Sequence, residues 1–215
     1  MSSRQARHDD ETASKSPGAT GSQATSLGIG GLEALLKAQA ERGEAPVESW
    51  NPPYCGDIGM AIRRDGTWFY QDSPIGRLPL VKLFARVLRR DPDGRHYLVT
   101  PVEKIDVDVE DAPFLAVELQ IEGEGKAQTL VFRTNVDDIV RVGPERPIRF
   151  STEPTSGGLK PYVLVRGRLE ALVTRALYYD LVELARPGPD GDPDRIGIWS
   201  AGAWFALEDN RRRLE

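Results

Sequence analysis

The spacing of apolar residues along this chain switches from a helical period to a period of two and back, and this switch most constrains the fold. The first helical stretch places apolar residues at i, i+3, i+4, i+7 and i+8, namely Leu80, Leu83, Phe84, Val87 and Leu88. Apolar and polar residues then alternate through residues 105–122, as in strands with one face in solvent. Helical spacing returns over about 168–185. Both periods together predict an α+β protein.

Shorter patterns predict the remaining elements. Residues 30–42 read as a short amphipathic helix, and residues 57–71 as a β-hairpin that turns at Asp65-Gly66. Further strands are expected at four places in the second half of the chain, namely 130–132, 148–150, 162–166 and 196–207.

Two segments enter their predicted helices in the same way, which indicates a duplicated unit. Gly76-Arg77-Leu78 precedes the first helix and Gly167-Arg168-Leu169 precedes the second. A Pro-Asp-Gly turn follows each helix, at 92–94 and at 189–191. We therefore predict two related strand–helix–strand units, each an antiparallel sheet packed with one amphipathic helix. The alternative is a coincidence between two common turn-to-helix signals.

The chain is expected to divide into five segments. These are a disordered tail (1–26), an amphipathic helix and linker (27–45), an N-terminal repeat unit (46–102), a C-terminal repeat unit (103–208) and a basic tail (209–215). The first tail has no large apolar residue after Met1 and cannot offset the entropy of ordering. No signal-peptide pattern and no long apolar run are present, so we expect a cytoplasmic protein without a membrane span.

Composition removes several classes of protein. One Cys and two His exclude a disulfide framework, a Cys-rich zinc site and a His-rich metal site. Lys and Arg number 28 against 33 Asp and Glu, which disfavours a nucleic-acid binder that relies on overall positive charge. Cys55 would need a base to act as a nucleophile, and only His96 is available, so Cys55 is expected to be structural. We expect no catalytic residue, no cofactor and no metal.

The cationic residues carry the strongest functional signal. Arg77 and Arg168 stand at equivalent positions in the two units, and Arg166 ends a predicted strand. Arg presents a planar fork that fits carboxylate or phosphate. If the two units face each other, such residues would line an anion-binding crevice between the halves. The candidate ligand-binding residues are Arg77, Glu103, Arg133, Asn135, Tyr162, Arg166, Arg168, Trp199 and Ser200.

The sequence therefore predicts a non-enzymatic ligand-binding or regulatory module for a small anionic or nucleotide-like ligand. Each Arg could instead pair with a carboxylate and tie the halves together. Three other functions stay open. They are an enzyme with Glu103 or Asp111 as base, a protein-interaction scaffold that uses an exposed sheet edge or apolar patch, and an RNA binder with Lys82, Arg86, Arg89 and Arg90 on one face. A protein partner is unknown.

Several long motifs resemble a proteobacterial family of uncharacterised proteins, domain of unknown function (DUF) 1285. The motifs are Trp50-Asn51-Pro52-Pro53, DGTWFY (65–70), SPIGR (73–77), VEDAPF (109–114), PYVLVRG (161–167) and WSAG (199–202). The resemblance covers about residues 45–208. It implies an α+β protein with repeated motifs and two domains, and a C-terminal half loosely similar to pleckstrin-homology folds. It also implies a ligand-binding role in signal transduction, and it supplies no catalytic residues.

Overall fold

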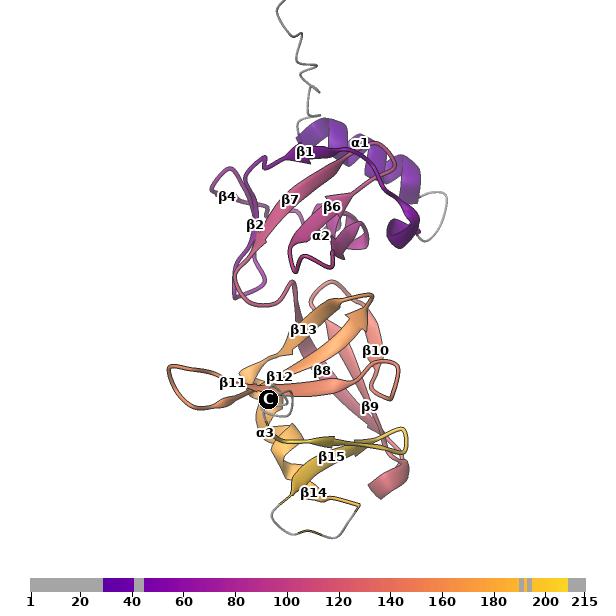
Figure 1. Ribbon diagram of the computed structural model, residues 1–215, viewed down its shortest axis with the longest axis vertical. Coiled ribbons are helices and arrows are strands. Elements are labelled where there is room, and N and C mark those ends of the chain that lie inside the picture. The colour runs from indigo at the N-terminus through magenta and orange to yellow at the C-terminus, as the bar shows by residue number, and fades with distance from the viewer. Residues whose placement is uncertain (1–28, 41–44, 190–191, 193–194, 209–215) are drawn as a thin grey trace, which may run out of the picture.

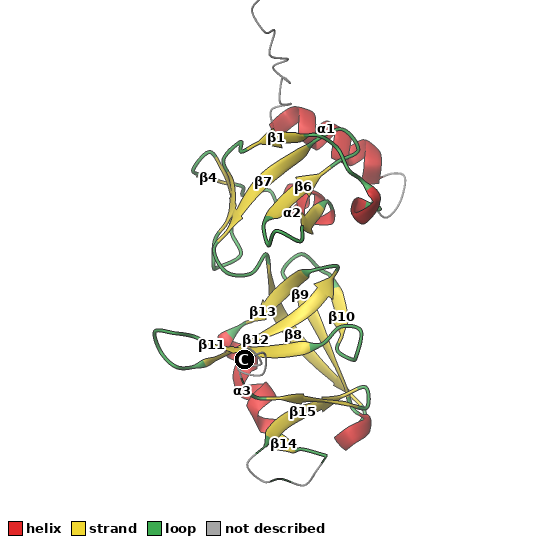
Figure 2. Ribbon diagram, viewed as in Figure 1, coloured by secondary structure: helices red, strands yellow, loops and turns green. Residues whose placement is uncertain are grey.

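The computed structural model describes residues 29–40, 45–189, 192 and 195–208. The tails expected at 1–26 and 209–215, and most of the turn expected at 189–191, lie outside the described residues. The protein is a mixed α+β structure dominated by sheet (Figures 1 and 2). One sheet lies in each half of the molecule, and a small third sheet lies against the second half (Figure 1).

The first half holds a seven-stranded sheet with the order β4-β3-β2-β7-β6-β5, to which β1 adds beside β7. Helix α1 (Ile29–Ala40) packs against helix α2, and the predicted hairpin is confirmed by the antiparallel pair β2 and β3. The elements after α1 are η1 (Val47–Ser49), β1 (Tyr54–Gly56), β2 (Met60–Ile62), β3 (Trp68–Tyr70), β4 (Ser73–Pro74), α2 (Leu78–Arg86), β5 (Leu88–Arg90), β6 (His96–Val99) and β7 (Lys104–Val109).

The second half holds a six-stranded sheet with the order β10-β9-β8-β13-β12-β11, followed by a helix and the small sheet β14-β15-β16. Its elements are β8 (Phe114–Glu122), η2 (Gly125–Ala127), β9 (Thr129–Thr134), β10 (Ile139–Arg141), β11 (Ile148–Thr152), β12 (Leu159–Arg166), β13 (Leu169–Val173), α3 (Arg175–Glu183), β14 (Arg186–Pro187), β15 (Ile196–Ser200) and β16 (Ala203–Ala206).

The two large sheets share one strand order. Apart from β1, the first sheet consists of two antiparallel runs of three consecutive strands, β2-β3-β4 and β5-β6-β7. The runs meet where β2, the first strand of one, lies parallel to β7, the last strand of the other. In the second, β8 and β13 take the same two places and are again parallel. Two sheets of this kind fit the predicted two-unit arrangement. The expectation of purely antiparallel sheets was wrong, because each sheet has a parallel pair at its centre. The likeness of the second half to pleckstrin-homology folds stays a prediction.

The predicted equivalence of the two Gly-Arg-Leu segments, from which we inferred the repeat, is wrong. Gly76-Arg77-Leu78 leads into α2, with Arg77 as its N-cap. Gly167 and Arg168 instead form the turn between β12 and β13, where Gly167 has a φ of +51°. The long helix expected from about residue 168 is therefore strand β13 followed by the short helix α3. Leu169, Ala171 and Val173 are buried on alternate positions, a period of two that the helical spacing of this stretch had obscured.

Two further boundaries differ from expectation. Helix α2 ends at Arg86, and residues 88–90 form β5, so the apolar residues Val87 and Leu88 do not belong to the helix. Strand β7 belongs to the first sheet, so the first structural unit extends past the division expected after residue 102.

The apolar core runs through both halves. Trp68, Phe84, Phe114, Phe132 and Phe150 are among its largest fully buried side chains. Trp68 and Phe84 stack with ring centroids 6.2 Å apart, which fixes α2 on the first sheet. No helix within the described ranges has the length and apolar character that a membrane crossing requires.

Candidate functional site

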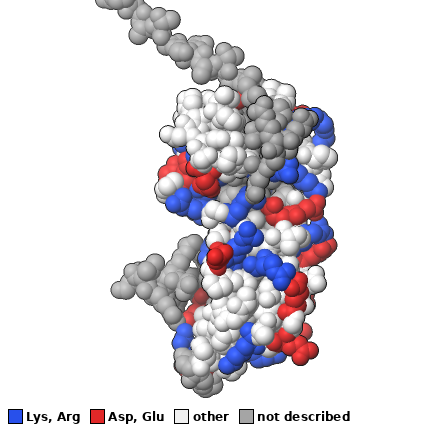
Figure 3. Space-filling model, turned by 90° about the vertical axis from the view of Figure 1, so that its right-hand side faces the viewer, with Lys and Arg blue, Asp and Glu red and all other residues white. Residues whose placement is uncertain are grey.

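The two halves are tied together by charged side chains from α2 and from the turn between β9 and β10. Lys82 of α2 pairs with Asp137 of that turn. Arg166, the last residue of β12, donates to a carboxylate oxygen of Asp138 and to the backbone carbonyl of Ala85, each at 2.5 Å. Figure 3 shows side chains of both charges gathered at the level where the halves meet. This junction is therefore polar at its rim.

Arg166 is held in place from three directions. Its guanidinium lies 5.2 Å from the centroid of the Phe114 ring, in addition to its bonds to Asp138 and Ala85. A cation over an aromatic face is stabilised by the ring quadrupole. The carbonyl of Ala85 lies in the last turn of α2, where the helix leaves carbonyls without intrahelical partners. Arg166 thus caps α2 from the other half of the molecule.

A hollow of about 470 Å³ lies beside these contacts, and we call it the junction hollow. Its charged lining residues are Lys82, Arg86, Asp137, Asp138 and Arg166, and its apolar lining comes from Pro79, Leu83, Ala85 and Val136. The volume falls in the range of about 300–1,000 Å³ that small-molecule sites occupy. Both halves contribute to its walls.

The carboxylates of the junction hollow are fixed by the β9–β10 turn. Thr134 Oγ1 accepts hydrogen bonds from the backbone N–H of Val136 at 3.3 Å and of Asp138 at 3.0 Å. Asp137 has a φ of +69°, a conformation that Asp tolerates better than most residues. Hydrogen bonds from Lys82 and then Arg133 hold the pKa of Asp137 below its usual value. Asp137 is therefore a charged partner near neutral pH.

Arg86 differs from the other cations of the junction hollow. It is exposed on α2, four residues after Lys82 and hence on the same side of the helix. In the part of the chain that the structure describes, Arg86 has no hydrogen-bond or ion-pair partner. Lys82 and Arg166 are neutralised by Asp137 and Asp138. Arg86 is thus the uncompensated positive charge of this hollow.

Two other hollows lie nearby. One of about 420 Å³ shares Arg166 and is lined mainly by η1, with Leu88, Gly167 and Leu169. The other, of about 430 Å³, lies on the first sheet and is lined by Arg95, His96 and the carboxylates of Asp57, Asp106 and Asp108. Burial, and then the charge of Arg90, lower the pKa of His96 to about 4, so the imidazole is neutral at physiological pH.

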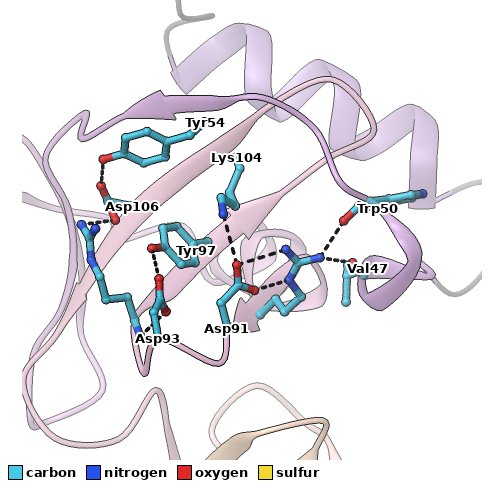
Figure 4. Close-up of polar contacts among 10 residues, drawn as sticks. Val47, Trp50, Tyr54, Asp91, Asp93, Tyr97, Lys104 and Asp106 are labelled. Atoms are coloured by element: carbon cyan, nitrogen blue, oxygen red, sulfur yellow. Dashed lines mark hydrogen bonds and ion pairs between the residues drawn. The ribbon is translucent and has the colours of Figure 1, made fainter.

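The face of the first sheet near η1 carries a second polar network (Figure 4). Arg89 donates to Asp91 at 2.6 Å and to the backbone carbonyls of Val47 and Trp50, both at 2.7 Å. Lys104 also donates to Asp91, at 3.2 Å. Arg89 is only 8% exposed, so it anchors η1 to β5 and offers nothing to a ligand.

Comparison with known proteins identifies the family. Residues 45–112 match the family described as "Domain of unknown function (DUF1285), N-terminal domain", and residues 113–207 match "Protein of unknown function (DUF1285), C-terminal domain". The chain is 44% identical to a DUF1285 family protein from Silicibacter pomeroyi DSS-3, covering 84% of this chain and 98% of that one, with a TM-score of 0.73. The chain belongs to the DUF1285 family.

A second DUF1285 family protein, from Shewanella baltica OS155, is 26% identical. The match covers 59% of this chain and 91% of that one, with a TM-score of 0.46. Comparison with curated proteins gives no match. The boundary between the two matched DUF1285 domains falls between residues 112 and 113, just after β7, in agreement with the two sheets.

Of the predicted cationic residues of this DUF1285 chain, only Arg166 lines the junction hollow. Arg77 is exposed and lies 3.4 Å from Glu33 of α1. Arg133 pairs with Glu118 and Asp137, which raise its pKa, so it supports the junction from outside the hollow. Arg168 is exposed in the β12–β13 turn. The structure therefore does not bring the predicted Arg set together.

The other predicted residues have structural contacts. Asn135 accepts from the backbone N–H of Leu115 at 3.0 Å, and Tyr162 donates to Asp111 at 2.7 Å. Ser200 is fully buried and bridges the backbones of Leu130 and Val142. Trp199 is half-buried, with the Lys126 ammonium 5.1 Å from its ring centroid. These contacts place all four away from the junction hollow.

Glu103 differs from the other predicted residues, because its carboxyl group is buried and one of its oxygens has no hydrogen-bond partner among the described residues. It is 4% exposed, and this oxygen is Oε1. Burial raises its pKa. Glu103 nevertheless lines none of the three hollows described above. Asp111, the other candidate base, is engaged by Tyr162 and Lys160.

The structure places two further sets of charged residues differently from the sequence expectation. Asp106, expected on a solvated strand face, is buried and bonded by Tyr54 and Arg95 (Figure 4). Within the described ranges, no group of three or more His, Cys, Asp and Glu is placed to hold a metal ion. The basic face expected for RNA is also broken up, since Arg89 is buried and Arg90 lies on β5.

Sequence reasoning missed the carboxylates Asp137 and Asp138 and gave Lys82 and Arg86 another role. The i, i+4 spacing of Lys82 and Arg86 on the polar side of a helix was visible in the sequence. The sequence did not show which turn would face that helix, because the turn lies about 50 residues further along the chain. Only the tertiary fold shows that these four residues share one hollow.

Proposed function

We propose that this protein is a non-enzymatic ligand-binding module that binds a small anionic ligand in the junction hollow. One observation carries the proposal: Arg86 lines a hollow of ligand size between the two halves and is not paired with a carboxylate in the described chain. A solvent-exposed guanidinium at a concave site is a ready partner for a carboxylate or a phosphate.

The position of the hollow supports a regulatory role. Its walls include α2 of the first half and the β9–β10 turn of the second, which are joined by Lys82–Asp137 and Arg166–Asp138. An anion bound at Arg86 would sit against both ion pairs. Its binding free energy would therefore act on how firmly the halves are held together, which suits a module in signal transduction.

Three of the alternatives are less well supported. An enzyme based on Glu103 or Asp111 has little support, because neither residue lines any of the three hollows described above. A scaffold would expose a continuous apolar patch, whereas the exposed large apolar residues are scattered over several elements. RNA binding would require a continuous basic face, and two of the four residues proposed for it do not contribute to one, since Arg89 is buried and Lys82 is paired with Asp137.

The proposal is tested by the change in melting temperature of the full chain with added anions. The probes are inorganic pyrophosphate and a set of small carboxylates, at constant ionic strength. A ligand that binds only the folded state raises the melting temperature. We expect at least one probe to do so, and we expect Arg86→Ala to remove the effect.

Arg77→Ala is the control, since it removes the same charge at the N-cap of α2, outside the hollow, together with an exposed contact to Glu33. Arg86→Ala should lower the melting temperature without ligand only slightly, because Arg86 is exposed and loses no hydrogen bond or ion pair within the described chain, only its charge in the last turn of α2. A probe response that survives Arg86→Ala, or no response to any probe, would show that the junction hollow is not an anion site.

A further inference from the structure

The charges that line the junction hollow restrict which anion fits it. Three cationic and two carboxylate side chains line it, which leaves one positive charge in excess. Lys82 is paired with Asp137, which also accepts from Arg133 at 2.7 Å. Arg166 is paired with Asp138 at 2.5 Å. The charge balance of the hollow therefore matches a ligand with one negative charge.

The remaining lining is apolar. Pro79 and Leu83 from α2 and Val136 from the β9–β10 turn lie between and around the charged residues. An apolar ligand body that covers these side chains is removed from water, which stabilises the complex in proportion to the apolar surface buried. A ligand made only of charged groups would gain nothing from this part of the wall.

A multiply charged ligand meets a specific obstacle. A second anionic group placed in the hollow would find Lys82 and Arg166 already neutralised, and it would lie near the carboxylates of Asp137 and Asp138. Displacing Asp138 from Arg166 would leave a like-charge contact in its place, which specific sites commonly use to reject a wrong partner. The two carboxylates thus act against polyphosphates and dicarboxylates.

We infer that the junction hollow selects small monocarboxylates with a compact apolar body, with Arg86 as the carboxylate ligand and Asp137 and Asp138 as the residues that reject further negative charge. This inference rests on the proposed function and narrows it. Of the small anionic and nucleotide-like ligands that the sequence left open, it disfavours the nucleotide-like ones, because a nucleotide carries several negative charges.

The test uses two pairs of probes that share a body and differ by one carboxylate: hexanoate against adipate, and benzoate against terephthalate. Affinities are measured by calorimetric titration of the full chain at constant ionic strength. We expect each monocarboxylate to bind about tenfold or more tightly than its dicarboxylate partner. Acetate, which lacks the apolar body, should bind more weakly than hexanoate.

Asp138→Asn supplies the second arm, since it uncovers Arg166 without changing the size of the side chain. This variant should improve the binding of adipate and terephthalate about tenfold and change that of hexanoate little. Asp108→Asn is the control, because Asp108 is an exposed strand residue outside the junction hollow. A gain in dicarboxylate binding confined to Asp138→Asn supports the inference.

The outcomes separate this inference from the proposed function. If pyrophosphate or the dicarboxylates bind the unmodified protein at least as tightly as the monocarboxylates, and Arg86→Ala abolishes that binding, the anion site stands and the charge selectivity is wrong. If no anion of either class binds, both proposals are wrong. If Asp138→Asn leaves the preference unchanged, Asp138 does not set the selectivity.

Discussion

Arg89 offers the sharpest test of how this structure is held together, because its one guanidinium group joins η1 to the residues that follow β5. It donates to Asp91, to the carbonyl of Val47 in η1 and to the carbonyl of Trp50 just after it (Figure 4). We consider Arg89→Met, which keeps an apolar stem and removes the charge. All three acceptors then lose their bond from Arg89 in a largely buried place, and Asp91 keeps only its bond from Lys104.

The expected loss follows from these contacts. Removing one partner of a buried ion pair costs about 3–5 kcal/mol, since the remaining charge is left uncompensated. Lys104 still donates to Asp91, at 3.2 Å, so the lower end of that range applies, about 3 kcal/mol. Burial raises the pKa of Asp91, but Arg89 and Lys104 together lower it overall, so the carboxylate is charged at neutral pH.

The measurement is urea unfolding followed by tryptophan fluorescence and by circular dichroism. With slopes of about 1–3 kcal/mol per molar urea, a loss of about 3 kcal/mol moves the midpoint by roughly 1–3 M. Arg63→Met is the control, because Arg63 pairs with Glu110 at the surface and such pairs contribute about 0–1 kcal/mol. Equal losses in the two variants would refute the reasoning that burial makes Arg89 the stronger contact.

Two further predictions concern Glu103 and Gly197. Burial raises the pKa of Glu103, so its contribution to stability is fully present below the unfolded value of about 4.3 and is lost as pH rises through the folded value. Glu103→Gln should therefore raise the melting temperature at pH 7 to 8 and match the unmodified protein near pH 4, and a difference independent of pH would contradict this. Gly197→Ala would overlap with the Phe205 carbonyl and the Trp204 ring and should cost about 1–3 kcal/mol in urea unfolding, whereas Gly76→Ala, which meets nothing within 4 Å, should be near neutral.

The sequence predicted helices and strands correctly where the spacing of apolar residues fitted only one period. The hairpin at β2 and β3, the helix α2 and the strands β8, β9 and β12 lie where the apolar spacing placed them. The prediction of a helix at residues 169–173 was wrong, because Leu169, Leu172 and Val173 satisfy the helical period as well as part of a strand pattern. Pairing with β8 and β12 decides between the two, and that pairing is a tertiary contact.

The candidate site was harder to predict than the fold, because it depends on which charges neutralise each other. Arg166 was expected at the crevice and lies there, yet its charge is taken up by Asp138. Arg86 was grouped with Arg89 and Arg90 as one basic face, although Arg89 faces inward. A count of charges along the chain cannot distinguish a paired guanidinium from a free one.

A departure from the shared organisation of the two units explains why the junction hollow forms where it does. In the first unit, α2 connects the two runs of three strands, between β4 and β5. The corresponding connection in the second unit, from β10 to β11, is residues 142–147 and contains no helix, while α3 follows the last strand. The helix that presents Lys82 and Arg86 thus has no counterpart in the second unit, and it faces the carboxylate-bearing β9–β10 turn instead. The hollow arises at a departure from the repeat, so a search for residues equivalent in both units could not have found it.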